Sequence, residues 1–258
     1  MKISFFTYDC MEKNKLSAEK ILPYNDTTSK GEQVETMFDS IAEKYDLLNH
    51  TLSFGIDKLW RKSGINMLKK DSPKKILDVA TGTGDLAIQA YKQLHPDHIL
   101  GIDISDGMME VGRRKVAGLG LSEHISFEKQ DCMNLQLEDD RFDAVMVAFG
   151  VRNFENLRQG LKEIRRVLKP GGKLMILELT TPRSFPMKQL YAFYSKIFIP
   201  SIGKLVSQSN EAYTYLPRTI EAFVQGEEMK HILLECGFSD ARYKKYTLGV
   251  CTMYFATK

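Results

Sequence analysis

The residues of this chain that could do chemistry gather around one glycine-rich stretch, 74–85, which reads K-K-I-L-D-V-A-T-G-T-G-D. A short, β-prone apolar run at 76–79 predicts a strand. Gly82 and Gly84 then allow the backbone to turn sharply against a ligand before a helix begins near Asp85. This order predicts the first crossover of a doubly wound α/β domain, whose ligand lies outside the carboxyl ends of the strands.

Charge within this stretch indicates which ligand it binds. The residues from Gly82 to Ala87 also satisfy the loose G-x-G-x-x-G/A pattern of NAD-binding enzymes. A pyrophosphate, however, binds the N–H groups at a helix start, where a carboxylate would repel it. Asp85 at that start and Asp78 in the strand favour a positively charged ligand such as S-adenosylmethionine, which has no phosphate. The alternative is that Asp85 only caps the helix.

Length and composition indicate one domain with appendages. The 258 residues, 43% of them hydrophobic, are enough for one sizeable core. A net charge of +3 gives no electrostatic case for binding nucleic acid. The four cysteines lack C-x-x-C spacing, so the sequence indicates no metal site and no disulfide framework, and a cytoplasmic location is expected.

We expect residues 1–30 to form a mobile N-terminal extension and residues 31–258 to form the single catalytic domain. The first ten residues hold too short an apolar run for a signal peptide, and no stretch reaches the roughly 20 apolar residues that span a bilayer. Apolar positions at helical spacing, followed by a second helix, predict a helical lid over 31–72. The sequence leaves open whether translation starts at Met1 or at Met11.

Strands and helices alternate after the glycine loop. Further strands are expected at 98–103, 125–127, 142–147 and 173–178, which implies a mostly parallel sheet with helices on both faces. The β-prone runs 241–246 and 250–256 predict a terminal hairpin that adds an antiparallel strand at the sheet edge.

Polar residues that follow these strands are candidates for the cofactor site. Asp103 ends the second strand about 20 residues past the glycine loop, where an acid hydrogen-bonds ribose hydroxyls in this architecture. Asp131 and Cys132 follow the third strand, and Asp131 can accept from an adenine amino group. The alternative is an ordinary loop aspartate. Arg152 and Asn153 follow the fourth strand and should face the reacting groups.

The segment 184–226 begins with a stretch rich in aromatic residues and broken by prolines. It predicts a helical insertion that covers the substrate, although an ordinary helical layer against the sheet explains the composition equally well.

Two stretches resemble a known family, the C-methyltransferases that act on quinone rings in menaquinone and ubiquinone biosynthesis. One runs from Tyr45-Asp46-Leu47-Leu48-Asn49 to Trp60, and the other is R-V-L-K-P-G-G at 166–172, continuing to Glu178. The chain departs from the family at Leu48, Asp57 and Thr180. The resemblance implies a Rossmann-like, class I fold with a seven-stranded sheet and an S-adenosylmethionine cofactor. Together with the glycine loop, it gives these cofactor-binding candidates: Asp78, Gly82, Thr83, Gly84, Asp103, Asp131 and Cys132.

The chemistry implied by this resemblance is methylation of a ring carbon beside a hydroquinone oxygen. That carbon gains electron density when the phenol, with a pKa of about 10, loses its proton. Arg152, beside Asn153, is the candidate for stabilising the phenolate, unless it is a plain surface ion-pair partner. Tyr45, Asp46 and Asn49 could close over the ring.

The leading hypothesis is therefore methylation of a polyprenylated quinol, converting demethylmenaquinol to menaquinol. The alternative within the family is a 2-polyprenyl-methoxy-benzoquinol of ubiquinone biosynthesis. Outside the family, the alternatives are a nucleotide-dependent oxidoreductase and a non-catalytic scaffold. A prenylated substrate implies peripheral contact with the inner face of a membrane, through 185–215. We expect Tyr191, Phe198 and Ile199 to face the tail and Lys188, Lys196 and Lys204 to lie at the level of the headgroups. The sequence leaves open the isoprenoid length and whether the protein is a homo-oligomer.

Overall fold

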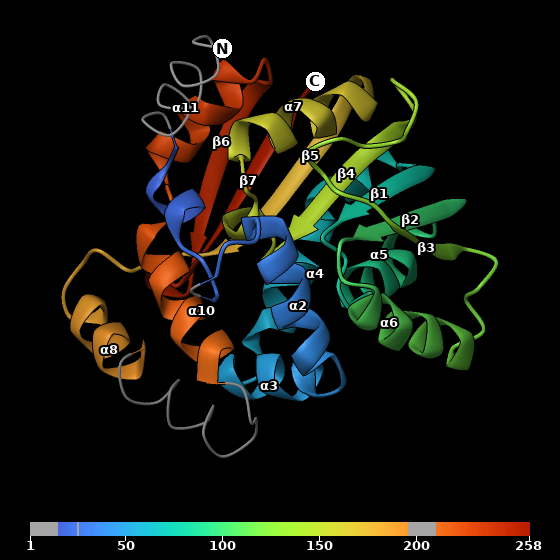
Figure 1. Cartoon of the computed structure of the whole chain (residues 1–258). Helices are drawn as coiled ribbons and strands as arrows, with labels where there is room; N and C mark the ends of the chain where they lie inside the picture. The colour runs from blue at the N-terminus through green and yellow to red at the C-terminus, as the bar shows by residue number, and fades with distance from the viewer. Residues whose placement is uncertain (1–14, 25, 196–209) are drawn as a thin grey trace, which may run out of the picture.

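One seven-stranded sheet lies at the centre of the residues that the computed structural model describes, 15–24, 26–195 and 210–258. The strand order is β3-β2-β1-β4-β5-β7-β6 (Figure 1). Strands β1 to β5 run parallel, and β7 is antiparallel to both of its neighbours. The strands are β1 (Lys75–Val79), β2 (His98–Asp103), β3 (Ile125–Lys129), β4 (Phe142–Ala148), β5 (Leu168–Leu179), β6 (Ser239–Tyr246) and β7 (Cys251–Thr257).

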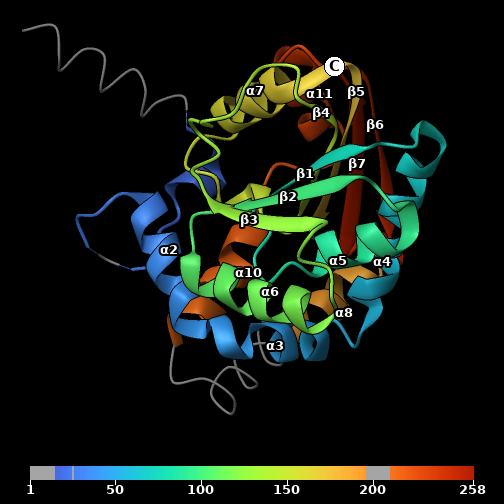
Figure 2. The ribbon, with the colours of Figure 1, turned by 90° about the vertical axis from the view of Figure 1, so that its right-hand side faces the viewer.

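Helices cover both faces of this sheet (Figure 2). Adjacent β1 residues show the division, because Ile76 packs toward α4 and α5 whereas Leu77 packs toward α7 and α11. The predicted doubly wound α/β fold is confirmed. The α-helices are α2 (Lys30–Ile41), α3 (Tyr45–Leu52), α4 (Ile56–Leu68), α5 (Asp85–Leu94), α6 (Asp106–Gly118), α7 (Leu157–Val167), α8 (Met187–Phe193), α10 (Asn210–Ala222) and α11 (Glu227–Glu235). Short 3₁₀ turns are η1 (Ser17–Lys20), η2 (Ala42–Lys44), η3 (Lys69–Asp71), η4 (Val151–Asn153) and η6 (Thr247–Gly249).

The C-terminal pair of strands differs from the prediction in one respect. The two runs do pair antiparallel, but the strand that reverses direction, β7, lies between β5 and β6 and not at the edge. Side-chain polarity explains the placement, because Met253, Tyr254 and Phe255 of β7 are all buried. The edge strand β6 carries exposed Lys244 and Lys245, which suit an open edge.

The regions expected to form a lid and an insertion pack against each other. Helices α2 and α3 contact α10 through an apolar cluster that includes Val34, Met37, Leu48 and Tyr215. These helices lie side by side beyond the carboxyl ends of β1 and β4 (Figure 1). The stretch 45–52, which shows no clear period in the sequence, is helical, with Tyr45, Leu48 and Leu52 directed into the same cluster.

Part of the expected N-terminal extension also packs against the domain. Glu19 of η1 is buried and accepts a hydrogen bond from the backbone N–H of Leu157, at 2.8 Å. Lys30 donates to the carbonyl oxygen of Ala18, at 2.7 Å. Among the described residues, no helix is long and apolar enough to cross a membrane.

The turns after β1 and β4 approach each other closely, and this leads to a prediction. A Cβ added to Gly150 would lie 2.5 Å from the Cβ of Ala80. We expect Gly150→Ala to lower the free energy of unfolding by about 1–3 kcal/mol, because overpacking forces the turns apart. Urea unfolding followed by circular dichroism measures this change. Gly118→Ala is the control, since no atom lies within 4 Å of its added Cβ. An equal loss in both variants would contradict the prediction.

Candidate active site

Two adjoining cavities lie at the carboxyl ends of the parallel strands. One has a volume of about 90 Å³ and the other about 310 Å³. Phe38, Tyr45 and Phe149 line both cavities and so form their common wall. Two ligands could therefore meet at this wall.

The smaller cavity contains four of the seven predicted cofactor residues. Gly82, Asp103, Asp131 and Cys132 line it, together with residues of α2 such as Phe38. Asp78, Thr83 and Gly84 lie outside this lining, in β1 and at the start of α5.

Asp103 is positioned by the glycine loop and by the start of α6. One of its oxygens accepts from the N–H of Gly82, at 2.8 Å, and the other from the N–H of Ser105, at 2.9 Å. Burial raises the pKa of Asp103 to about 6, against the opposing effect of these hydrogen bonds. Each carboxylate oxygen has a second lone pair, which suits the two hydroxyls of a ribose.

Asp78 lies within the sheet, directly below the cavity. The Thr81 hydroxyl donates to its Oδ2 at 2.7 Å, while Oδ1 is buried and has no hydrogen-bond partner among the described residues. Burial raises the pKa of Asp78 to about 7. The Thr81 hydroxyl and the backbone N–H of Ala87, in the first turn of α5, act against this effect of burial.

Of the remaining predicted cofactor residues, Asp131 and Cys132 line the smaller cavity, and Thr83 and Gly84 lie outside its lining. Asp131 is exposed and accepts from the N–H of Met133, at 2.9 Å, in a turn geometry. Burial raises the pKa of Cys132, so the thiol stays neutral. Thr83 donates to Asp46 at 2.5 Å, and Gly84 has a φ of 76° in a position where a Cβ would lie 2.8 Å from Phe127.

The smaller cavity fits an adenosine ligand that carries positive charge. Its lining includes the acids Asp103, Asp131 and Glu155 but, among the described residues, neither Lys nor Arg. A pyrophosphate would find no cationic partner in this lining. The residues present therefore fit S-adenosylmethionine better than NAD.

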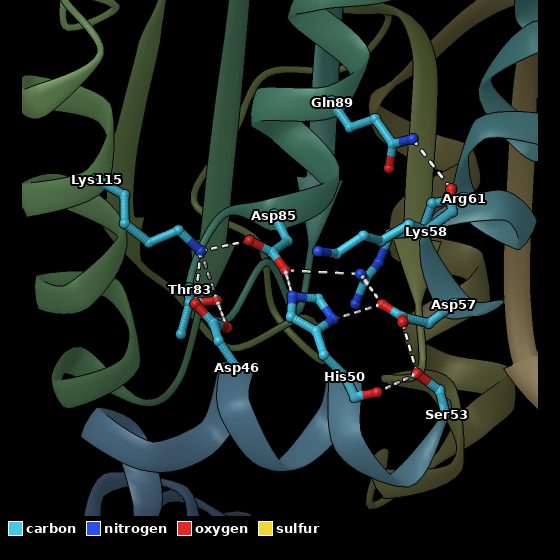
Figure 3. A network of polar contacts seen from close by, with 10 residues as sticks. All are labelled: Asp46, His50, Ser53, Asp57, Lys58, Arg61, Thr83, Asp85, Gln89 and Lys115. Atoms are coloured by element: carbon cyan, nitrogen blue, oxygen red, sulfur yellow. Dashed lines mark hydrogen bonds and ion pairs between the residues drawn. The ribbon is translucent and has the colours of Figure 1, made fainter. Parts of the chain in front are cut away.

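Asp85, on which the charge argument from sequence depended, does not face this cavity. Its carboxylate lies in a network of polar contacts with Lys115 and Arg61 (Figure 3). Burial alone would raise the pKa of Asp85, but the charges of Lys115, Arg61 and His50 outweigh it and hold the pKa below its usual range. The interpretation of Asp85 as a ligand-facing acid was wrong, because its carboxylate pairs with Lys115 and Arg61 instead. The sequence does not reveal these partners, since they come from distant parts of the chain.

The network continues through the first helices of the domain. His50 Nδ1 lies 3.0 Å from Asp57, which also accepts hydrogen bonds from Ser53 and Arg61 (Figure 3). Lys115 of α6 donates to Asp46 of α3 at 2.7 Å and also to Asp85. Through Asp46 and Lys115, the network joins α3 to α5 and α6 around the glycine loop.

A line of acids along α2 to α3, which we call the acidic stripe, makes further contacts of this kind. Its members are Glu35, Asp39, Glu43 and Asp46. Glu35 pairs with Lys129 at 2.6 Å, and Glu43 pairs with Arg114. Asp39 accepts from the Ser105 hydroxyl at 2.6 Å and from the N–H of Gly107 at 3.0 Å. The stripe thus attaches α2 and α3 to β3 and α6, above the smaller cavity. Its spacing is visible in the sequence, but its partners are not.

Arg152 lies at the larger cavity, whose lining is mostly apolar and aromatic. Its Nη1 donates to Glu178 at 2.8 Å and to the carbonyl oxygen of Phe149, while its buried Nε has no partner among the described residues. Both Arg152 and Glu178 are buried, so this is no surface ion pair. Sequence reasoning missed Glu178 as the partner of Arg152.

The larger cavity is also lined by polar side chains that could orient a ligand, among them tyrosines and an asparagine. Burial raises the pKa values of Tyr45, Tyr191 and Tyr215, so these phenols remain neutral donors. Asn49 lines this cavity, whereas Asn153 lines the smaller one with a buried, unpartnered Oδ1. Asp46 lies outside both linings.

Residues 26–258 match the model of the ubiE/COQ5 methyltransferase family. The chain belongs to this family. A demethylmenaquinone methyltransferase of Bacteroides fragilis is 59% identical over 93% of this chain and 98% of its own length. The ubiquinone/menaquinone biosynthesis C-methyltransferase UbiE of Geobacter sulfurreducens is 42% identical over 97% of this chain and 95% of its own length.

Solved structures agree on the fold. A SAM-dependent methyltransferase of Thermotoga maritima, described as a possible histamine N-methyltransferase, has a TM-score of 0.61 and 19% identity, over 86% of this chain and 99% of that one. The [4+2]-cyclase SpnF has a TM-score of 0.65 and 16% identity, over 88% of this chain and 96% of that one. Three predictions are confirmed: the family, the methyltransferase activity, and S-adenosylmethionine as the cofactor.

The geometry of Asp103 gives a prediction for cofactor binding. Asp103→Ala should raise the dissociation constant of S-adenosylmethionine about tenfold or more, because charge-assisted hydrogen bonds contribute roughly 1.5–3 kcal/mol. Calorimetry measures the constant, with exposed Asp106→Ala as the control. In the parent protein, binding should also weaken as the pH falls through about 6, where Asp103 takes up a proton. An unchanged constant in the variant would remove Asp103 from the site.

The acidic stripe gives a second prediction. Lys115→Met removes the cation that joins Asp46 to Asp85, so α3 should be held less firmly near the cofactor cavity. We expect the dissociation constant of S-adenosylmethionine to rise roughly threefold to tenfold. Arg113→Met is the matched control, because the ion-pair partners of Arg113 among the described residues, Asp106 and Glu110, both lie within α6. Equal constants in the two variants would show that this contact does not support cofactor binding.

Proposed function

We propose that this protein transfers a methyl group from S-adenosylmethionine to a ring carbon of demethylmenaquinol. The S–CH₃ bond breaks and the ring carbon loses its proton, so the products are menaquinol, S-adenosylhomocysteine and a proton. The observation that carries the proposal is the buried Arg152, which lines an aromatic cavity adjoining the acidic one and whose Nε has no hydrogen-bond partner among the described residues. The relatives named demethylmenaquinone methyltransferase support this choice of substrate.

The smaller cavity would hold the cofactor. Asp103 would bind the ribose hydroxyls, Asp131 the adenine amino group and the Gly82–Gly84 loop the methionine part, near the carboxylate of Asp78. Asn153 Oδ1 offers a further acceptor in this cavity. When bound, the cofactor supplies an electrophilic methyl group.

The larger cavity would hold the quinol ring. Arg152 would stabilise the phenolate oxygen through its free Nε–H, since a fixed cation in a water-poor cavity lowers the cost of that charge. Glu178 keeps the guanidinium in place by accepting from Nη1 and from the backbone N–H of Arg152. Tyr45 and Asn49 would orient the ring, and Tyr45, on the common wall, would set its distance from the methyl group.

Asp46 has a different role in this proposal from the one that the sequence suggests. Thr83 and Lys115 already engage its carboxylate, so it would position α3 over the glycine loop without touching the ring.

A benzoquinol of ubiquinone biosynthesis is the second candidate substrate, because the UbiE relatives are named for both pathways. A prenylated quinol also implies that the protein works in the cytoplasm and meets the inner face of a membrane. Of the residues expected to contact the prenyl tail or the headgroups, Phe198, Ile199, Lys196 and Lys204 lie outside the described residues.

An assay of methyl transfer to short-chain demethylmenaquinol and to the matching benzoquinol tests the proposal. Turnover of the first and not of the second is expected. Mass spectrometry of quinones from cells that lack the protein should show a precursor one methyl group lighter. Absence of transfer to both quinols, with S-adenosylmethionine bound, would overturn the proposal.

Arg152 gives a prediction for the chemical step. Arg152→Lys keeps the positive charge but loses Nε, and we expect kcat to fall roughly 10²-fold, with the dissociation constant of S-adenosylmethionine unchanged. The loss should shrink as the pH rises toward the phenol pKa of about 10, because the phenolate then forms without help.

Melting temperature is the control for Arg152→Lys, because breaking a buried ion pair costs about 3–5 kcal/mol. If the lysine variant unfolds, Arg152→Met combined with Glu178→Gln removes both charges together. Full activity in either folded variant would contradict the proposed role.

A further inference from the structure

The larger cavity reaches the surface between α8 and the turn that joins α3 to α4. Phe54 of that turn and Leu190 of α8 both line the cavity, yet they are 71% and 59% exposed. The Tyr194 hydroxyl donates to the carbonyl oxygen of Leu52, which connects the α8 side of this opening to the α3 side. The cavity therefore has a mouth with apolar side chains on both sides.

Further apolar side chains stand beside this mouth. Phe185, just before α8, and Phe193, the last residue of α8, are 82% and 64% exposed and are not part of the cavity lining. Soluble surfaces seldom gather so many large exposed apolar side chains, and such a patch marks an interaction site. We call Phe54, Phe185, Leu190 and Phe193 the mouth face.

In the sequence, the segment that contains α8 carries charge of one sign only. From Leu179 to Asn210 the sequence contains four basic residues and neither Asp nor Glu, although the whole chain carries only +3. Two of the four, Arg183 and Lys188, are exposed in the described part of this segment. Basic residues among exposed apolar ones fit an anionic surface that also accepts apolar side chains.

We propose that the mouth face docks onto an anionic phospholipid bilayer and opens the larger cavity directly to it. Phe185, Leu190 and Phe193 enter the acyl boundary, while Arg183 and Lys188 meet the headgroups. A second copy of the chain seated on this face would close the mouth, whereas a bilayer leaves it open to a tail that already lies among the acyl chains. The inference rests on the proposed function in one respect: a prenylated substrate is the reason why docking would be useful.

Vesicle sedimentation with the full chain tests the docking. Phosphatidylcholine vesicles with and without phosphatidylglycerol are the probes. We expect binding to vesicles that contain phosphatidylglycerol, and Phe185→Ser with Phe193→Ser should weaken it roughly tenfold or more. The matched control is Leu119→Ser with Leu234→Ser, two exposed leucines at α6 and α11. Equal weakening in both double variants, or none in either, would overturn the proposal.

The charge component has its own test. Arg183→Gln with Lys188→Gln should reduce the preference for phosphatidylglycerol about tenfold, and added salt should weaken binding by the parent. Exposed Lys69→Gln with Lys70→Gln, at the far end of α4, is the control. Loss of the preference in the control pair as well would show that net charge alone, and not the mouth face, directs binding.

Activity and mass measurements separate this inference from the proposed function. The double serine variant should keep its turnover of a tail-less quinol and lose turnover of a long-chain quinol held in vesicles. An inactive parent would reject the proposed function and leave the vesicle result standing. If the variant instead changes a dimer to a monomer in light scattering, with vesicle binding unchanged, the face is an interface between copies and the docking proposal fails.

Discussion

Burial of one charge, the guanidinium of Arg152, is the constraint on which the site depends. Removing a cation from water costs several kcal/mol, and the cost is offset only by a well-placed partner. Glu178 provides that partner from β5, a strand enclosed between β4 and β7. The position of β7 inside the sheet helps to keep Glu178 away from water.

Much of the fold and part of the site could be predicted, because the signals for them are local. Asp103 follows from its distance along the chain after the glycine loop, and Arg152 from its place after a parallel strand. Asp85 was misread for the opposite reason. Its charge is compensated by Lys115 and Arg61, which lie far from it in the sequence. Likewise, β6 lies at the sheet edge because β7, and not β6, pairs with β5. Periodicity within β6 or β7 does not predict this pairing.

The two cavities differ in the charge and polarity of the side chains that line them. The smaller one combines acids with an absence of basic residues among its described lining, so it suits a cation. The larger one has mostly apolar and aromatic walls with Arg152 among them, and the one acid in its described lining, Asp57, is already paired with Arg61, so the cavity suits an apolar molecule that becomes an anion at one oxygen. Ion pairs such as Asp46 with Lys115 lie outside both cavities, where they attach helices without changing the charge that a ligand meets.

The common wall of Phe38, Tyr45 and Phe149 has a thermodynamic consequence. Two of these side chains belong to α2 and α3, so whatever fixes those helices over one ligand also shapes the cavity of the other. Binding free energies coupled through a shared element must be coupled equally in both directions. With the ligands assigned as proposed, loss of the methyl group and its positive charge in the smaller cavity would change the affinity of the larger cavity for the quinol. Release of the methylated quinol would then depend on whether the cofactor has given up its methyl group.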